Sequence, residues 1–186
     1  HPRLGGTVSL NPSAAAAVLT FGAAPLSLRA FAPLRYEGVL PYNSRVQMIP
    51  KEMQAVVYRG VNDLRVETVP VPRIGGNELL VRVAVCGVCP TDIKKIQHGT
   101  VPGPRIFGHE TAGTIVKLGA RVRGFRLGDR VALHHHIPCL DCHACRHRAF
   151  AQCLQYKRTG ITAGFEPAGG GYAEYVCCEA NRTGMV

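Results

Sequence analysis

Four cysteines lie within fifteen residues of the chain, in the segment CLDCHACRHRAFAQC, with two, two and seven residues between them. In a C-x2-C turn both thiolates point to one centre, so two such turns and a returning cysteine meet the tetrahedral preference of zinc. Sulfur fills all four positions and leaves no place for water or substrate, so the spacing predicts a closed, structural zinc site. The predicted ligands are Cys139, Cys142, Cys145 and Cys153.

A disulfide framework is the alternative interpretation of this cysteine density. In a secreted disulfide scaffold the cysteines are spread through a short chain, whereas four of the eight here crowd into one segment. Nearby histidines could compete as ligands, but four thiolates are the simpler solution, and we interpret the histidines as surface or pocket residues. They are His134, His135, His136, His143 and His147.

A second group of candidate ligands lies upstream, in CGVCPTD (86–92) and FGHE (107–110). Cys89 and, twenty residues later, His109 would give a mixed sulfur and nitrogen zinc site. Three protein ligands and one exchangeable position are the open arrangement that metal catalysis needs. One cysteine and one histidine are weak evidence on their own, because a buried cysteine and a hydrogen-bonded histidine are common in protein cores.

The elements that must position these residues are mostly short strands. Alternating or β-branched runs separated by Gly and Pro predict a mainly β domain, a sandwich or a barrel. A short helix is predicted over residues 90–99, because Pro90 suits a first turn and Gly99 suits a helix end. The predicted strands cover residues 54–59, 64–71, 78–88, 110–119, 129–136 and 172–178.

Residues 1–50 differ in composition from the rest of the chain. They are rich in Ala, Ser, Leu and Pro, carry spaced arginines and contain no acid before Glu37. This composition fits a plastid or mitochondrial transit peptide, with a plain disordered leader as the equal alternative. The predicted organisation is a leader over residues 1–50 and one zinc-binding domain over residues 51–186. The expected location is an organelle if the leader is a transit peptide, and the cytoplasm otherwise.

The net charge of +10 does not indicate a nucleic-acid-binding protein. The basic residues after the leader are scattered singly or in short pairs such as Lys94–Lys95, and no basic stripe interleaved with aromatics is present. No apolar run approaches the roughly 20 residues that a bilayer-spanning helix needs. We therefore expect neither a nucleic acid nor a membrane as partner.

Five motifs follow one another in unbroken order between about Met53 and Val186. They are CGVCPTDIKKIQHG, PRIFGHETAGTIVKLG, GDRVA, the cysteine segment and GGGYAEY. Together they resemble the N-terminal catalytic domain of the zinc-containing medium-chain alcohol dehydrogenases. The resemblance is closest to the polyol (sorbitol-like) and threonine dehydrogenases, because His98–Gly99 stands where polyol dehydrogenases carry a similar pair. It implies a GroES-like β-barrel with a short helix and a zinc-lobe loop.

The resemblance also implies roles for individual residues. Cys89 and His109 match ligands of a catalytic zinc, and Glu110 matches a carboxylate that approaches or transiently binds the metal. Asp92 matches the carboxylate that hydrogen-bonds the ligand histidine and fixes its tautomer. Thr91 matches the hydroxyl that touches the substrate oxygen.

His98 is the candidate for passing the substrate's proton to solvent. The four cysteines of the segment 139–153 match the structural zinc lobe. The remaining cysteines match no ligand and are expected to be ordinary strand residues. They are Cys86, Cys177 and Cys178.

The function implied is hydride transfer between a small alcohol or polyol and NAD or NADP, with one structural and one catalytic zinc. A homo-oligomer is a further expectation. The family's third catalytic ligand and its Rossmann domain lie beyond Val186, and the glycines of AGGGYAEYV precede a β-type run rather than opening a helix. We therefore expect a catalytic-domain portion that is inactive alone.

Two alternatives to this function remain. The first is a zinc-binding GroES-like module without dehydrogenase activity. The second is a zinc ribbon for nucleic acid, which is disfavoured because it does not explain the CGVC and GHE motifs upstream.

Overall fold

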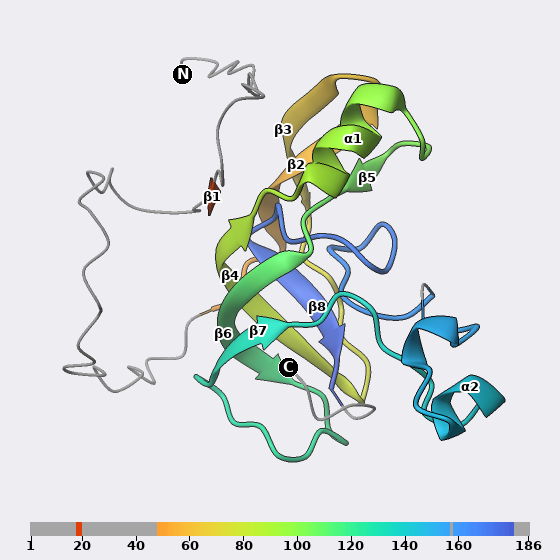
Figure 1. Ribbon diagram of the computed structural model, residues 1–186. Helices are drawn as coiled ribbons and strands as arrows, with labels where there is room; N and C mark the ends of the chain where they lie inside the picture. Colours follow the sequence, from red (N-terminus) through yellow and green to blue (C-terminus); the bar gives the residue numbers. More distant parts are fainter. Residues whose placement is uncertain (1–17, 20–47, 157, 181–186) are drawn as a thin grey trace, which may run out of the picture.

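The computed structural model describes residues 18–19, 48–156 and 158–180 of the chain (Figure 1). Two antiparallel sheets form its body. In the first, β4 (Glu78–Gly87) pairs along one side with β6 (Glu110–Leu118), which in turn pairs with β7 (Arg130–Leu133), and along its other side with β8 (Tyr175–Glu179). The second has the order β3 (Asp63–Pro70), β2 (Glu52–Gly60), β5 (Arg105–Ile106). The prediction of a mainly β fold is confirmed.

The segment that precedes β8 joins the two sheets. The backbone N–H of Val56 in β2 donates to the carbonyl of Tyr172 at 2.8 Å, and that of Val83 in β4 donates to Glu174 at 2.9 Å. Between the sheets lies one continuous apolar core, and burial of this surface is the main stabilising contribution to the fold. Its fully buried members include Met53, Val57, Leu79, Val81, Ile115 and Val176.

The helix α1 (Pro90–His98) follows β4 directly and lies beside the three-stranded sheet (Figure 1). Its start and end agree with the signals in the sequence. Pro90 occupies the first turn, and Gly99 adopts a left-handed conformation (φ 62°) in which its N–H bonds the carbonyl of Lys95 at 3.0 Å. No helix within the described ranges is long and apolar enough to cross a membrane.

The cysteine-rich segment forms a lobe that lies apart from both sheets (Figure 1). It contains the single-turn helix α2 (His143–Arg146) and a 3-10 turn, η1 (Phe150–Gln152). Neither element was predicted, because a stretch of three or four residues is too short to show a periodic pattern. The two-residue strand β5 was missed for the same reason.

Two predicted strands have different bounds in the structure. The run 129–136 was predicted as one strand, but β7 ends at Leu133, and His136 makes only an isolated bridge to Gly160. The three histidines leave the sheet because the chain turns there toward the lobe. The strand predicted over residues 172–178 starts later in the structure, because β8 begins at Tyr175 and the residues before it connect the two sheets.

Most of the predicted leader lies outside the described residues. Within it, Val18–Leu19 form β1, which pairs with Cys86 and Gly87 at the end of β4, beyond the point where β8 stops. The chain is then described from Met48 onward, just before β2 begins. The division into a leader and a domain at residue 50 stays a prediction.

Gly108 stands where a side chain cannot be accommodated. Its φ is +94°, and an added Cβ would lie 2.6 Å from Cδ1 of Tyr172 and 2.9 Å from Sγ of Cys86. We expect Gly108→Ala to lower the free energy of unfolding by roughly 2–4 kcal/mol, combining backbone strain with overpacking. Gly124 is the matched control, because its φ is also positive (+82°) but no atom lies within 4 Å of an added Cβ. Urea unfolding of both variants tests this, and an equal loss in both would contradict the role of packing.

Candidate metal centres

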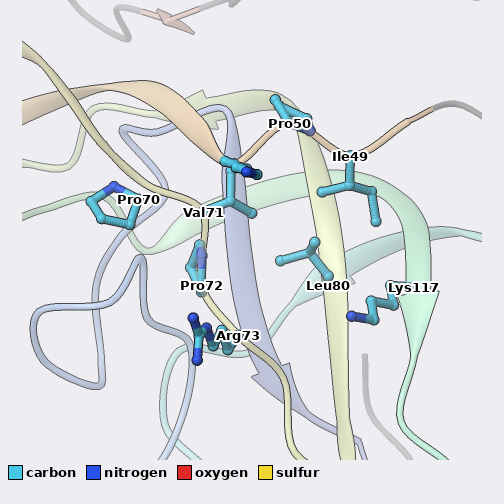
Figure 2. A pocket seen from close by; sticks show the side chains of 9 residues that line it. Ile49, Pro50, Pro70, Val71, Pro72, Arg73, Leu80 and Lys117 are labelled. Atoms are coloured by element: carbon cyan, nitrogen blue, oxygen red, sulfur yellow. The ribbon is translucent and has the colours of Figure 1, made fainter.

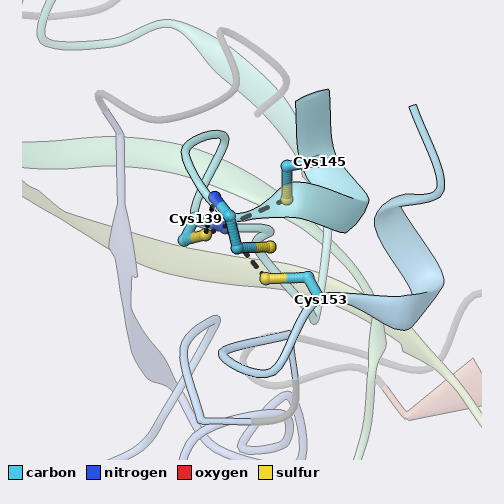
Figure 3. Close-up of side chains that lie close together, drawn as sticks. Cys139, Cys145 and Cys153 are labelled. Atoms are coloured by element: carbon cyan, nitrogen blue, oxygen red, sulfur yellow. Dashed lines mark hydrogen bonds between the residues drawn. The ribbon is translucent and has the colours of Figure 1, made fainter. Parts of the chain in front are cut away.

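The four cysteines of the lobe place their sulfur atoms around one point. All four Sγ atoms lie within 4.8 Å of one another, and those of Cys139 and Cys145 are 3.9 Å apart. Figure 3 shows the side chains of Cys139, Cys145 and Cys153 directed toward a common centre. Four sulfurs bound to one zinc at about 2.3 Å would be about 3.8 Å apart, so the spacing fits a tetrahedral zinc site.

Local backbone geometry produces this convergence. Leu140 adopts a left-handed conformation (φ 60°), which turns the chain tightly after Cys139. Backbone N–H groups then point at sulfur: the N–H of Cys142 donates to Cys139 at 3.3 Å, and that of Gln155 donates to Cys153 at 3.4 Å. Such N–H groups favour thiolate over thiol, which is the form that binds metal.

The pKa values of the lobe cysteines indicate that this cluster suits a bound cation. Backbone N–H groups of Asp141 and Cys142 lower the pKa of Cys139 to about 6, and the N–H of Cys139 lowers the pKa of Cys153. Burial raises the pKa of Cys145 to about 12, and the neighbouring thiols add to this rise. Four sulfurs this close therefore cannot all be thiolates unless a cation balances their charge. The donor set fits zinc.

A second group of donors lies where α1 and β6 begin. Cys89 is the N-cap of α1, His109 directly precedes β6, and Glu110 is the first residue of β6. One ligand atom from each lies within 4.8 Å of the other two. The side chains of Cys89 and His109 are half-buried and that of Glu110 is exposed, so the group faces outward on one side. One sulfur, one nitrogen and one carboxylate oxygen are ligands that zinc accepts.

Asp92 fixes the orientation of the His109 ring. Its Oδ1 lies 3.3 Å from Nδ1 of His109, and the carboxylate is 1% exposed. This hydrogen bond raises the pKa of His109, and burial of the ring opposes the rise. With Nδ1 engaged by Asp92, the ring presents Nε2 to the Cys89 side of the site, which is the arrangement found in carboxylate–histidine–metal triads.

Thr91 lies at the mouth of this second group. Its hydroxyl donates to Sγ of Cys89 at 3.2 Å and lies 3.4 Å from Nε2 of His109. The residue is exposed, so an incoming molecule reaches this hydroxyl from solvent. The structure thus brings together Cys89, Thr91, Asp92, His109 and Glu110.

His98 does not belong to this cluster. It lies at the far end of α1, about 10 Å along the helix axis from Thr91 at 1.5 Å per residue. It is exposed, and within the described part of the chain no hydrogen bond joins it to the site residues. Its predicted part in proton transfer stays a prediction.

The run of histidines after β7 packs against the second group. The ring of His135 lies 4.8 Å from that of His109, and His134 stacks on His135 at 5.5 Å. Burial lowers the pKa of His135, and electrostatic repulsion from neighbouring side chains, His109 first among them, lowers it further. A lowered pKa favours the neutral ring, which can both donate and accept a hydrogen bond. By contrast, His143 and His147 lie exposed on the lobe.

The remaining cysteines are buried strand residues, as the sequence indicated. Cys86 in β4 is fully buried and lies 3.3 Å from Oγ1 of Thr111, and burial raises its pKa to about 11. Cys177 and Cys178 in β8 are buried as well, and burial raises the pKa of Cys178 to about 12. None of these thiols is positioned to act as a nucleophile or as a ligand of either group.

A hollow elsewhere on the surface contains none of these residues. It has a volume of about 500 Å³ and lies beside β4 and β6 (Figure 2). Its walls are apolar residues and prolines, with basic side chains among them, and no acid, thiol or histidine. The lining residues include Ile49, Pro50, Val71, Arg73, Leu80 and Lys117. The chemistry of the chain thus lies at the two donor groups rather than in this hollow.

Comparison with known proteins identifies the domain. Residues 75–186 match the model of the alcohol dehydrogenase GroES-like domain, which is more than half of the chain. The chain belongs to the alcohol dehydrogenase GroES-like domain family. Both donor groups described above lie within the matched residues. The family resemblance inferred from the motifs and the expected GroES-like fold are confirmed.

Individual relatives of this GroES-like domain are named as dehydrogenases or as a reductase. Sorbitol dehydrogenase from Bombyx mori is 38% identical over 109 residues, which are 56% of this chain and 31% of that protein. The cobalt- and zinc-bound thermostable alcohol dehydrogenase from Pyrobaculum aerophilum has a TM-score of 0.61 and 30% identity, over 70% of this chain and 40% of that one. Acetophenone reductase from Geotrichum candidum NBRC 4597 in complex with NAD has a TM-score of 0.62 and 28% identity, over 72% and 40%. The chain spans about a third of the length of the curated relatives that it matches.

The structure adds residues that sequence reasoning missed. Tyr172, within the quoted motif GGGYAEY, contacts Asp92 although the two are 80 residues apart. His135 was grouped with the lobe, but its ring packs on His109. The run of three histidines was a signal in the sequence that could have indicated the role of His135. No local pattern indicated the contact of Tyr172 with Asp92.

Proposed function

We propose that this GroES-like domain is the catalytic-domain portion of a zinc-dependent alcohol or polyol dehydrogenase that uses NAD or NADP. The observation that carries the proposal is the convergence of one ligand atom each from Cys89, His109 and Glu110 within 4.8 Å. The Thr91 hydroxyl lies beside two of these atoms, 3.2 Å from Sγ of Cys89 and 3.4 Å from Nε2 of His109. A donor group open to solvent on one side suits metal-assisted chemistry, whereas the closed lobe suits a structural metal. The dehydrogenase names of the relatives agree with this assignment.

The contacts suggest a separate role for each of the two donor groups. Cys89, His109 and Glu110 would hold the catalytic zinc, and the four lobe cysteines would hold the structural one. When bound at the second group, Cys89, His109 and Glu110, zinc would supply Lewis acidity that lowers the pKa of a substrate hydroxyl. Asp92 keeps Nδ1 of His109 protonated and so leaves Nε2 as the ligand atom. NAD or NADP would accept the hydride, with the hard chemistry residing in the cofactor.

Thr91 is the proposed relay for the substrate's proton: its hydroxyl would accept that proton and release its own toward solvent in the same step. The residue is exposed, and its hydroxyl donates to Sγ of Cys89 and lies 3.4 Å from Nε2 of His109, so a substrate oxygen beside these atoms would lie within its reach. His98 would pass the proton on to solvent, which requires water or another group to span the roughly 10 Å along α1.

A polyol is the favoured substrate class. The wall beside the site is formed by the rings of His134 and His135, which offer hydrogen bonds instead of an apolar surface. A substrate with several hydroxyl groups satisfies such a wall, whereas an aliphatic alcohol would leave its polar atoms unpaired. The sorbitol dehydrogenase among the relatives points in the same direction.

Metal content of the purified 186-residue chain tests the proposal. We expect one zinc per chain to survive a chelator, held by the lobe, and a second to bind more weakly at Cys89, His109 and Glu110. With cobalt at the second group, sorbitol should change the visible absorption, because an alcohol oxygen enters the open position. Dehydrogenase turnover is expected only when a nucleotide-binding domain is supplied.

A zinc-binding module without enzymatic activity is the competing function. It predicts one metal per chain, no second cobalt signal and no response to sorbitol. That outcome would contradict the proposed active site while leaving the lobe assignment intact.

A further inference from the structure

Tyr172 lies buried between the two segments that carry the candidate ligands of the second group. The residue is 4% exposed and precedes β8, at the end of the glycine run 169–171. Its backbone N–H donates to the carbonyl of Phe107 at 3.0 Å, and the N–H of Gly171 donates to Gly108 at 2.9 Å. These bonds hold the stretch that leads directly into His109.

The hydroxyl of Tyr172 reaches the other ligand segment. Its oxygen lies 3.0 Å from Oδ2 of Asp92 and 3.3 Å from the carbonyl of Gly87, two residues before Cys89. The other oxygen of the same carboxylate, Oδ1, lies 3.3 Å from Nδ1 of His109. A continuous chain of contacts therefore runs from the Tyr172 hydroxyl through Asp92 to His109.

The hydroxyl is not needed to fill space. A phenylalanine ring would occupy the same volume, but a buried carboxylate without a donor at Oδ2 is costly, because Asp92 is 1% exposed and water cannot replace the phenol. Burial and the charge of Asp92 both raise the pKa of Tyr172, so the phenol keeps its proton and remains a donor.

We propose that Tyr172 is a positioning residue for the second metal group: its hydroxyl fixes the Asp92 carboxylate, which holds His109 with Nε2 directed toward Cys89. The inference rests on the proposed function of that group. A carboxylate held at one oxygen only could rotate, and the His109 ring would then lose its preference for one tautomer and one orientation.

The test is Tyr172→Phe in the 186-residue chain, with Tyr175→Phe as the matched control. Tyr175 lies three residues further on, in β8, where it pairs with Arg82. With zinc in the lobe, titration with cobalt should show about a tenfold weaker second site in Tyr172→Phe and no change in Tyr175→Phe, in the range expected for partners outside the ligand shell. Zinc affinity of the lobe should be the same in both variants.

The metal-free chain provides an independent measurement. Long-range nitrogen–proton NMR of the His109 ring should show the Nδ1–H tautomer in the wild type and in Tyr175→Phe, and a mixture of tautomers in Tyr172→Phe. An unchanged cobalt affinity together with an unchanged tautomer would overturn the role of Tyr172, even if the variant were less stable. If the wild type bound no cobalt at the second group, the proposed function would be contradicted instead. The NMR measurement of the His109 tautomer would then still test the role of Tyr172.

Discussion

Cys142→Ser is expected to empty the lobe of its metal while the two sheets remain folded. Serine offers a hydroxyl in place of one of four thiolates, so the affinity should fall by more than the roughly 10–100-fold that loss of an outer partner causes. Without the metal, the remaining thiols no longer have a cation to balance them, and burial keeps Cys145 protonated. The segment 139–153 should then open locally, because the lobe lies apart from the sheets and the metal would join its four cysteines (Figure 1).

Zinc analysis and limited trypsin digestion measure this result. Arg146 and Arg148 lie exposed within the lobe, so cleavage there should become much faster in Cys142→Ser. Cys178→Ser is the control, since Cys178 is 1% exposed in β8 and belongs to neither donor group. It should lower the stability of the whole domain and keep the zinc. Retention of full zinc content by Cys142→Ser would contradict the four-cysteine assignment.

The convergence of the four lobe cysteines could be predicted from the sequence because the signal for it is local. Four cysteines spaced by two, two and seven residues must converge when the chain turns tightly, whatever the rest of the fold does. The same holds for α1, whose ends were predicted from Pro90 and Gly99, and for strands with clear alternation such as β2. Each of these elements depends on residues close together in the chain.

The second group could not be built from local signals in the same way. Cys89 and His109 belong to different elements, and their proximity depends on how β4, α1 and β6 follow one another. A family resemblance supplied the pairing, whereas the contacts of Tyr172 with Asp92 and of His135 with His109 appeared only in three dimensions. The predicted end of the strand at residue 136 was wrong for a related reason. The path of the chain after Leu133 is set by packing against the second donor group and the lobe.

Cys89→Ser is expected to remove the second metal and leave the lobe and the fold intact. The residue is a half-buried N-cap at which serine is a favoured substitute, so the helix should not be weakened. The remaining donors would be one histidine and an exposed carboxylate, too few for tight binding of zinc. In a protein that includes the nucleotide-binding domain, kcat/KM should fall by roughly 1,000-fold or more, because several kcal/mol of charge stabilisation would be lost.

Cys86→Ser is the matched control for this experiment, since it changes the same atom three residues earlier in the chain. The Cys86 thiol is fully buried against Thr111 and its pKa is raised to about 11, so it is a packing residue and should not affect metal content. Cobalt titration and zinc analysis of both variants compare the two cysteines directly. Loss of the second metal in Cys86→Ser but not in Cys89→Ser would reverse the assignment of ligand and core. Unfolding of both variants would show that the CGVC motif is structural and would remove the distinction between the two metal groups on which the proposed mechanism depends.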